Sequence, residues 1–330
     1  MAGYLVRRVL GMLVLLFLLT TTVFFLFNIL PGDPARLTCG KACSPTIIEA
    51  NRHRLGLDEP VLTQYGKFVA GIFLGRTFSP DSPEPIVCSA PCLGYSFKRG
   101  EQVLPLIMRS APVTFYLAIG AFVIWLVVGI SLGIYAALRR GRWQDRLIMT
   151  ISLVGYSLPS FFIGLLLVFF VIVKWGLLPF PSYVSPFENP VQFTQTMILP
   201  WMVLAALNAA FYMRLTRNQV LETLGDDYVR TARAKGLPER TVIVHHALRA
   251  GLTPIVTAAG LDLAYLLGGA IITENIFSLP GLGALAVNSI TDSDLPLIAG
   301  ITLLTASLII FANLIVDLLY AVIDPRVRLA

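Results

Sequence analysis

Charged side chains are scarce in this sequence of 330 residues, where Asp, Glu, Lys and Arg together make up 13% of the chain. Soluble domains usually carry about 25% charged residues. Hydrophobic residues reach 56%, the mean hydropathy is +0.77, and the charges are segregated, so that long stretches contain almost none. The composition excludes an ordinary soluble globular protein and predicts a membrane protein.

Sequence motifs that carry catalysis are absent as well. The chain has no Gly-x4-Gly-Lys-Ser/Thr phosphate loop, so it is not itself a P-loop ATPase, and it has no His-Glu-x2-His or Gly-x-Ser-x-Gly motif. Besides His53, its histidines are the adjacent His245 and His246, whose side chains would point about 100° apart on a helix and make a poor metal pair. We therefore expect no enzymatic activity and no metal site formed by the histidines.

Six apolar stretches are long enough, or nearly so, to cross a membrane, which takes about 20 helical residues. The first follows Arg7 and Arg8, but it is too long for a signal-peptide core and lacks a small-residue cleavage site, so we expect a retained helix. The fourth is the shortest and contains Pro200. The sequence predicts an all-α polytopic protein with six transmembrane helices at 9–30, 113–138, 147–173, 197–213, 253–273 and 296–323.

Basic residues set the expected orientation. More than half of the Lys and Arg residues lie in the N-terminal segment, the loops at 139–146 and 214–252, and the C-terminal tail, which six spans would place on one side. Short loops rich in Lys and Arg stay in the cytoplasm, so both termini are predicted to be cytoplasmic. The predicted domains are an N-terminal helix 1–30, an extracytoplasmic segment 31–112, a five-helix core 113–323 and a tail 324–330.

All four cysteines lie in the long outer segment, as two Cys-x3-Cys pairs. Two interpretations fit this spacing. Paired cysteines can bind zinc or an iron–sulfur centre, whereas an even number of cysteines on an oxidising face usually forms disulfides. We favour disulfides, but four cysteines allow three pairings and the sequence does not choose among them. The candidates are Cys39, Cys43, Cys88 and Cys92.

One carboxylate lies near the middle of a predicted span. Asp262 has no Lys or Arg at a comparable depth, and a carboxylate there costs about 2.5–3.5 kcal/mol on insertion scales. It must be protonated, hydrated or bonded to groups such as Asn208, Asn313 or a second subunit. Asn208, Asp262 and Asn313 are thus candidates for lining a pathway or for locking helices together. Gly129 and Gly133 form a small-residue face that predicts close helix packing.

The stretch "DDYVRTARAKGLPER" at 226–240 is an unusually charged segment of the chain. Asp226 and Asp227 would begin a helix and Arg233 would lie near its end, as the helix dipole favours. Gly236, followed by a proline, would stop it. Such a short helix could lie on the membrane surface or fit a groove in another protein. Its small residues and single aromatic favour the groove.

Four ordered stretches give the chain a family resemblance. "DDYVRTARAKGLPERTVIVHHALRAGLTPIV" resembles the cytoplasmic loop of permease subunits in binding-protein-dependent ABC importers of the dipeptide, oligopeptide and nickel branch. "FNILPGDP", "ENIFSLPGLG" and "VDLLYAVIDPRVR" resemble the same subunits, and the long outer segment is similar to the B-type of two paired permeases. The cysteine-bearing portions 38–44 and 81–94 are outside the resemblance. The family's Glu-Ala-Ala triplet loses its glutamate here, where the chain reads Thr231-Ala232-Arg233-Ala234.

The resemblance implies a type I ABC permease fold and a pore-forming subunit that imports dipeptides or oligopeptides through the cytoplasmic membrane of a bacterium or archaeon. Its partners would be a C-type permease, two ABC ATPases that bind ATP and Mg, and an extracytoplasmic binding protein. No cofactor bound by this chain and no nucleic acid are expected. The implied coupling helix includes Asp227, Tyr228, Arg230, Thr231, Ala232, Arg233, Ala234 and Gly236, and the implied outer gate loop includes Glu274, Phe277, Pro280, Gly281 and Gly283.

Two alternative functions stay open. A permease for nickel or another small solute would share these motifs, although the predicted spans contain no His or Cys to carry a metal. A secondary transporter or channel would work without ATP, but such proteins often show inverted repeats and several buried ions. No repeat is evident here, and a single mid-span carboxylate is present, so the ABC importer is favoured.

Overall fold

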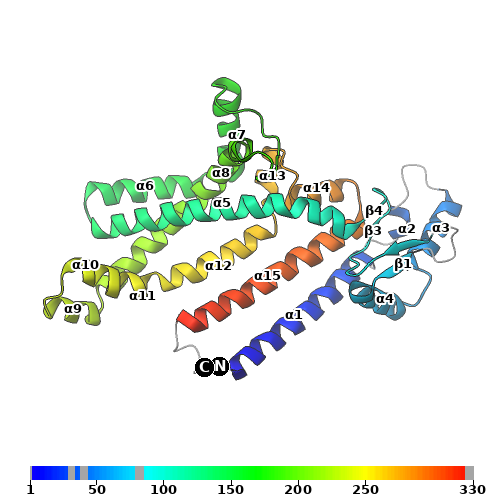
Figure 1. Ribbon diagram of the computed structural model, residues 1–330, viewed down its shortest axis with the longest axis horizontal. Helices are drawn as coiled ribbons and strands as arrows, with labels where there is room; N and C mark the ends of the chain where they lie inside the picture. The colour runs from blue at the N-terminus through cyan, green and yellow to red at the C-terminus, as the bar shows by residue number, and fades with distance from the viewer. Residues whose placement is uncertain (1, 29–33, 38–43, 79–84, 324–330) are drawn as a thin grey trace. The chain divides into compact units, whose positions relative to one another are not determined.

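The computed structural model describes residues 2–28, 34–37, 44–78 and 85–323, and most of them are helical (Figure 1). They divide into two compact units, which are treated separately. The first unit draws on Met1–Thr114 and Pro280–Leu314, and the second on Phe115–Leu279 and Ile315–Ala330. Two long helices, α5 and α15, contribute residues to both units.

The first unit combines membrane-length helices with a small mixed region. In chain order its elements are α1 (Ala2–Asn28), α2 (Pro34–Leu37), α3 (Pro45–Leu55), α4 (Val61–Leu74), β1 (Arg76–Phe78), β2 (Ile86–Cys88), β3 (Tyr95–Ser96), β4 (Glu101–Gln102), the start of α5 (Val103–Leu138), α14 (Leu282–Thr291) and most of α15 (Leu295–Ile323).

The regular elements described in the second unit are all helical. After the rest of α5 come α6 (Trp143–Ser157), α7 (Ser160–Leu167), the π-helical segment η1 (Val168–Lys174), α8 (Pro190–Leu224), α9 (Asp227–Ala234), α10 (Glu239–Thr241), the π-helical segment η2 (Val242–Leu248), α11 (Arg249–Gly251), α12 (Thr253–Leu267) and α13 (Ile271–Ile276).

Four described helices, α1, α5, α8 and α15, are long and apolar enough to cross a membrane, and two bent pairs raise the number to six if each pair is one span. The pair Glu239–Gly251 and Thr253–Leu267 bends by 44°. The pair Trp143–Ser157 and Ser160–Lys174 bends by 97°, so the predicted span 147–173 is not one straight helix. Pro159 explains the bend, because the residue before a proline avoids helical geometry and Leu158 is extended, with φ −85° and ψ 131°.

Glycines allow α5 to approach α8 closely. A Cβ atom added at Gly129 would lie 2.6 Å from the Tyr212 Cβ atom, and one added at Gly133 would lie 2.6 Å from the Thr216 Cβ atom. The indole of Trp201 in α8 donates a hydrogen bond to the Tyr116 carbonyl in α5 at 3.0 Å. The small-residue face predicted from the sequence is therefore confirmed as a helix-packing surface.

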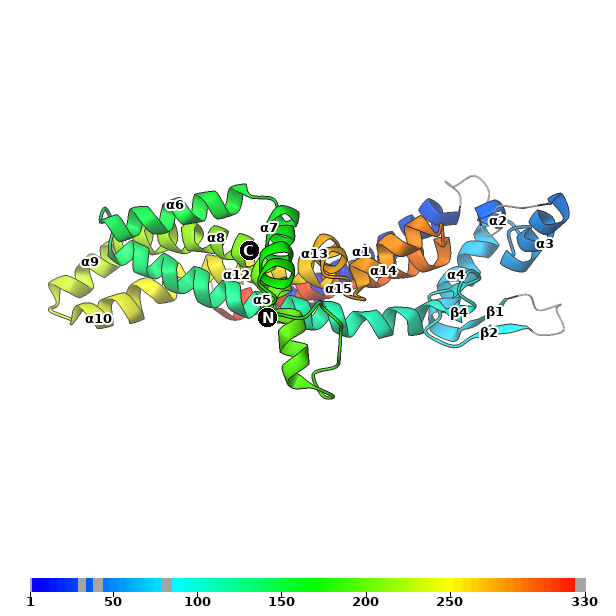
Figure 2. The ribbon, with the colours of Figure 1, turned by 90° about the horizontal axis from the view of Figure 1, so that it is seen from above.

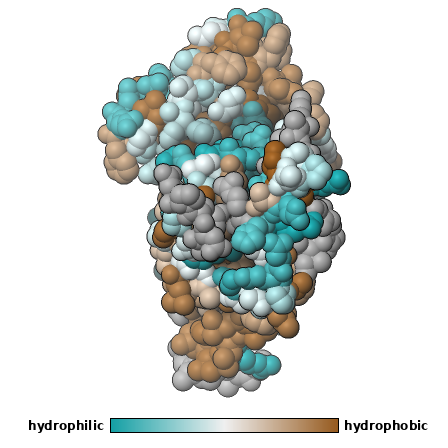
Figure 3. All heavy atoms as spheres, turned by 90° about the vertical axis from the view of Figure 1, so that its right-hand side faces the viewer, coloured by the Kyte–Doolittle hydropathy of each residue, from teal (hydrophilic) through white to brown (hydrophobic). Residues whose placement is uncertain are grey.

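Two short hairpins in the first unit were not predicted from the sequence. β1 pairs antiparallel with β2, and β3 with β4, and the first hairpin lies beside α4 (Figure 2). A disulfide joins Cys88 to Cys92, as the favoured interpretation of the cysteines expected, whereas Cys39 and Cys43 lie outside the described residues. Hydrophilic and hydrophobic residues are mixed on the face that carries these hairpins (Figure 3).

Arg76 is a half-buried cation at the start of strand β1. Its guanidinium carbon lies 4.3 Å from the centre of the Phe78 ring and 5.8 Å from that of Phe68. Burial lowers the pKa of Arg76 to about 10, so the group remains charged at neutral pH. Aromatic faces attract such cations, and these rings hold the guanidinium within the fold.

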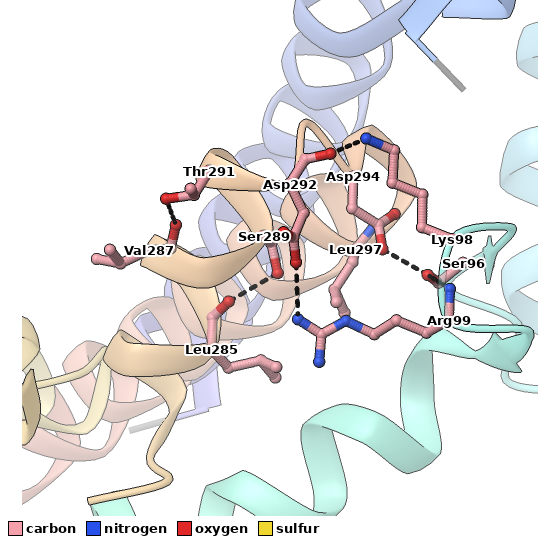
Figure 4. A network of polar contacts seen from close by, with 10 residues as sticks. All are labelled: Ser96, Lys98, Arg99, Leu285, Val287, Ser289, Thr291, Asp292, Asp294 and Leu297. Atoms are coloured by element: carbon pink, nitrogen blue, oxygen red, sulfur yellow. Dashed lines mark hydrogen bonds and ion pairs between the residues drawn. The ribbon is translucent and has the colours of Figure 1, made fainter. Parts of the chain in front are cut away.

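A polar network ties the second hairpin to the start of α15 (Figure 4). The Ser96 hydroxyl donates to the Asp294 carboxylate, and the Lys98 ammonium donates to the Asp292 carbonyl. Arg99 forms a 3.5 Å ion pair with the Asp292 carboxylate. Asp294 also accepts from the Leu297 backbone N–H at 3.4 Å, so one buried carboxylate caps the helix and anchors the hairpin.

The α5–α8 contact leads to a stability prediction. Gly129→Ala should destabilise the second unit by about 1–3 kcal/mol, because the added methyl group overpacks the Tyr212 side chain. Gly155→Ala is the matched control, since its new Cβ would sit 3.4 Å from Ala210, an ordinary contact. Thermal unfolding in detergent measures both variants, and an equal midpoint for the two would contradict close α5–α8 packing.

Candidate functional site

The charged stretch predicted from the sequence folds as a helix at one end of the second unit, past the ends of α6 and α8 (Figure 1). Helix α9 follows the extended residue Asp226, and Gly236 just beyond it has φ +76°, the left-handed conformation that favours glycine. Pro238 then precedes α10. The short helix and both of its predicted ends are confirmed.

One face of α9 is buried within its own loop. Val229, Ala232 and Val242 form a small apolar cluster with Leu224 from the end of α8. Of the residues expected to meet a partner, Ala232 therefore packs inward. The outward-facing members of that set are Asp227, Tyr228, Arg230, Thr231, Arg233, Ala234 and Gly236.

Polar contacts fix the geometry of the loop. Arg233 pairs with Glu239 through two nitrogens, with Nη2–Oε1 at 2.7 Å and Nε–Oε2 at 3.2 Å. The Tyr228 hydroxyl donates to the His246 carbonyl at 3.4 Å, and burial together with the nearby Asp226 charge raises the pKa of Tyr228. The sequence did not identify Glu239 as a partner, although a carboxylate six residues after Arg233 was an available signal.

The two ends of the 214–252 loop are held against α6 and α8. Arg217 in α8 donates to both oxygens of Asp145 in α6, at 2.5 and 2.9 Å, and Asp145 also accepts from the Gly141 N–H at 2.9 Å. Where the chain leaves the loop, a Cβ atom added at Gly251 would lie 3.2 Å from the Thr223 hydroxyl of α8. The chain segments that enter and leave the loop are thus held together.

Asp262 in α12 has a partner that the sequence did not reveal. It accepts a 2.6 Å hydrogen bond from the Tyr212 hydroxyl of α8. The Tyr212 side chain is fully buried, and its ring stacks on that of Trp125 with centroids 6.4 Å apart. A bond between α8 and α12 joins the two helices that flank the loop.

The other polar candidates do not join this pair through a described hydrogen bond. Asn208 donates to the Leu204 carbonyl of its own helix at 2.9 Å. Asn313 is an exposed residue of α15 in the first unit. Within the second unit, the structure thus brings Tyr212, rather than Asn208, to the Asp262 carboxylate.

The predicted gate loop begins in the second unit and ends in the first. Glu274 and Phe277 are fully buried, and a Cβ at Gly164 in α7 would lie 3.8 Å from the Phe277 ring. Within the first unit, Pro280 is exposed, whereas Gly281 and Gly283 are buried. Beside them, the Leu282 N–H donates to the Thr114 hydroxyl at 2.8 Å.

The fold and these sites define a multi-pass membrane protein with a compact hydrophilic loop between two of its spans. Residues 129–329 match the family described as "Binding-protein-dependent transport system inner membrane component", and residues 1–118 match the corresponding N-terminal family. The chain belongs to this family of inner-membrane transport components.

Curated relatives match the chain from end to end. A Brucella abortus (strain 2308) protein named as a peptide transport system permease is 37% identical over 331 residues, 99% of each chain. A glutathione transport system permease protein of Escherichia coli (strain K12) is 38% identical over 328 residues, also 99% of each chain.

A solved structure shares the fold. The MetNI methionine ABC transporter, in an inward-facing conformation, matches with a TM-score of 0.52 and 19% identity over 67% of this chain and 97% of that chain. The predicted all-α fold of a type I ABC permease is therefore confirmed.

The Tyr212–Asp262 bond can be tested by a double-mutant cycle. Tyr212→Phe should cost about 1–3 kcal/mol, because it leaves a half-buried carboxylate oxygen without its donor. The same substitution in an Asp262→Leu background should cost markedly less, since no carboxylate then remains. Unfolding by SDS titration in mixed micelles gives the four stabilities. Equal costs in both backgrounds would show that the bond contributes nothing to stability.

Proposed function

We propose that this chain is a pore-forming permease subunit of an ATP-driven importer of dipeptides or oligopeptides. The observation that carries the proposal is the match along the whole chain to relatives named for peptide and glutathione transport. Family membership supports a transport role. The peptide substrate is the narrower claim and rests on those relatives alone.

The proposed assembly contains a homologous C-type permease, two ABC ATPases and an extracytoplasmic substrate-binding protein. ATP and Mg bind the ATPases, and this chain binds neither. Both termini and the 214–252 loop lie in the cytoplasm, which the concentration of Lys and Arg in these segments supports.

The proposed contact with an ATPase is the outward face of α9. Asp227, Tyr228, Arg230 and Thr231 are exposed there, while Val229 and Ala232 anchor the helix from behind. Because α8 leads into this loop and α12 leads out of it, a shift of α9 moves both spans. Closure of the ATPases then drives rigid-body alternating access.

The remaining polar residues have proposed roles along the transport path. Asp262, held by Tyr212, locks α8 to α12. Asn208 in the second unit and Asn313 in the first are each proposed either to line the path or to bond between helices. The segment that includes Glu274 and Phe277 forms an extracytoplasmic gate, and their complete burial supports a closed position for it.

Reconstitution tests the proposed function. The chain should co-purify with P-loop ATPase subunits, and proteoliposomes that contain the assembly and its binding protein should take up labelled di- and tripeptides only when ATP is inside. Uptake of nickel or another solute, but not of peptides, would overturn the proposal that peptides are the substrate. Uptake without any ATPase would overturn the importer mechanism.

A pair of glycine variants tests the proposed coupling contact. Gly236→Asp should abolish ATP-driven uptake while the protein still inserts, because a charge and a strained left-handed residue are placed beside α9. Gly141→Asp is the matched control. Gly141 has φ +78° and Gly236 has φ +76°, and both have open space around them. Gly141, however, lies in the hydrophilic loop between α5 and α6. Uptake and ATPase rates in proteoliposomes distinguish the two variants. Full transport by the Gly236→Asp variant would show that the segment 226–240 is only a solvated loop.

A further inference from the structure

Helix α4 in the first unit carries an apolar face that the described residues leave largely exposed. Leu62 is 84% exposed and Phe73 is 75% exposed, which is unusual for large hydrophobic residues outside a membrane span. Both belong to a stripe with Gly66 and Val69 at spacings of four, three and four residues, which places all four on one side of a helix. The stripe contains no polar side chain.

A neighbouring face of α4 is fixed to the membrane-spanning helix α1. The Tyr65 hydroxyl shares a 2.8 Å hydrogen bond with that of Thr21. The Phe24 ring of α1 lies 5.3 Å from the Tyr65 ring and 5.6 Å from the Phe68 ring. These contacts are within the first unit, so the position of α4 relative to α1 is defined.

The contact with α1 sets the depth of α4. Thr21 lies six residues before Phe27, the end of the apolar span Leu5–Phe27, which is about 9 Å along a helix. A helix that touches α1 at this level lies at the boundary between the acyl chains and the headgroups, the depth that interfacial helices occupy.

The apolar surface of α1 continues onto α4. Leu10, Val14 and Phe17 of α1 are each more than half exposed, and their spacing places them on the same side of α1 as Thr21. Thr21 is one of the α1 residues that contact α4. The exposed stripe of α1 therefore leads to the level at which α1 bonds to α4.

The side of α4 away from the stripe carries Lys67 and, in the last turn of the helix, Leu74, which is 83% exposed. Lys67 lies across the helix from the stripe, is 61% exposed and forms an ion pair with Glu59. Helices in the membrane interface combine an apolar face with a lysine that reaches toward water. A soluble partner would have to enter the acyl region to reach the stripe at this depth.

We propose that α4 is an interfacial helix and that acyl chains of the bilayer cover its stripe of Leu62, Gly66, Val69 and Phe73. The extramembrane segment is then held at the membrane surface by its own lipid contact as well as by α1.

Photocrosslinking tests the proposal on the full chain, in phospholipid vesicles with the subunits that co-purify with it. p-Benzoylphenylalanine replaces Phe73 in one variant and Lys67 in a second, and a third carries it at Phe17 of α1 as the positive reference. Phe73 and Lys67 are both exposed, so neither replacement disturbs the core. Intact-mass analysis after irradiation should find phospholipid adducts at positions 17 and 73, several-fold more than at position 67.

Three outcomes would overturn the lipid assignment. A crosslink from position 73 to a polypeptide, whether a second permease or a binding protein, would make the stripe a protein interface. Equal lipid labelling at positions 73 and 67 would show that lipid does not select the stripe over the opposite side. No labelling at 73 while position 17 reacts would leave α4 in water. A second pair, Phe73→Leu and Phe73→Glu, separates charge from shape, since only the glutamate variant should release α4 and increase protease cleavage between α4 and α5.

Discussion

Helix α8 is the element against which the second unit is built, because small residues on its neighbours let their backbones come close to it. Gly129 and Gly133 bring α5 against Tyr212 and Thr216, Gly155 brings α6 near Ala210, and Gly251 brings α11 near Thr223. In lipid, helices gain little from burying apolar surface against each other, so association depends on close van der Waals packing. A larger side chain at any of the tightest positions would push a helix away from α8.

Polar groups on α8 determine which helices it holds and at which level. Arg217 fixes α6 near the hydrophilic loop, Tyr212 fixes α12 deeper in the unit, and the Ala210 carbonyl accepts from Ser152 in α6 at 2.5 Å. Leaving such a group unpaired in a low-dielectric interior is costly. These bonds fix one register of each helix on α8. Packing of small residues alone would allow the helices to slide along α8.

Local sequence signals predicted much of this fold, and long-range contacts account for what they missed. The apolar stretches placed the four described long helices α1, α5, α8 and α15. The dipole-matched charges and stop glycine of α9 predicted that helix, because each signal lies within the element that it defines. The partner of Asp262 was missed because Tyr212 is 50 positions away and several polar residues could have reached the carboxylate. The two-residue strands β3 and β4 are too short to give an alternation pattern. Pro159 did offer a signal for the bend after α6, since proline restricts the residue before it.

The core of the first unit combines residues from the first third of the chain with residues near the C-terminus. Val103 and Ile107 pack with Leu282, Leu297 and other residues near the C-terminus, and Ser96 reaches Asp294 across 198 positions.

This connectivity imposes an order on biosynthesis. At roughly 5–20 residues per second, the ribosome adds Asp294 about 10–40 s after it adds Ser96. During that interval the hairpin lacks the carboxylate that anchors it, and its apolar side faces an unfinished neighbour. A chain cut short before α14 would therefore lose the fold of its beginning as well as its end, and quality-control proteases would recognise it by that exposed surface.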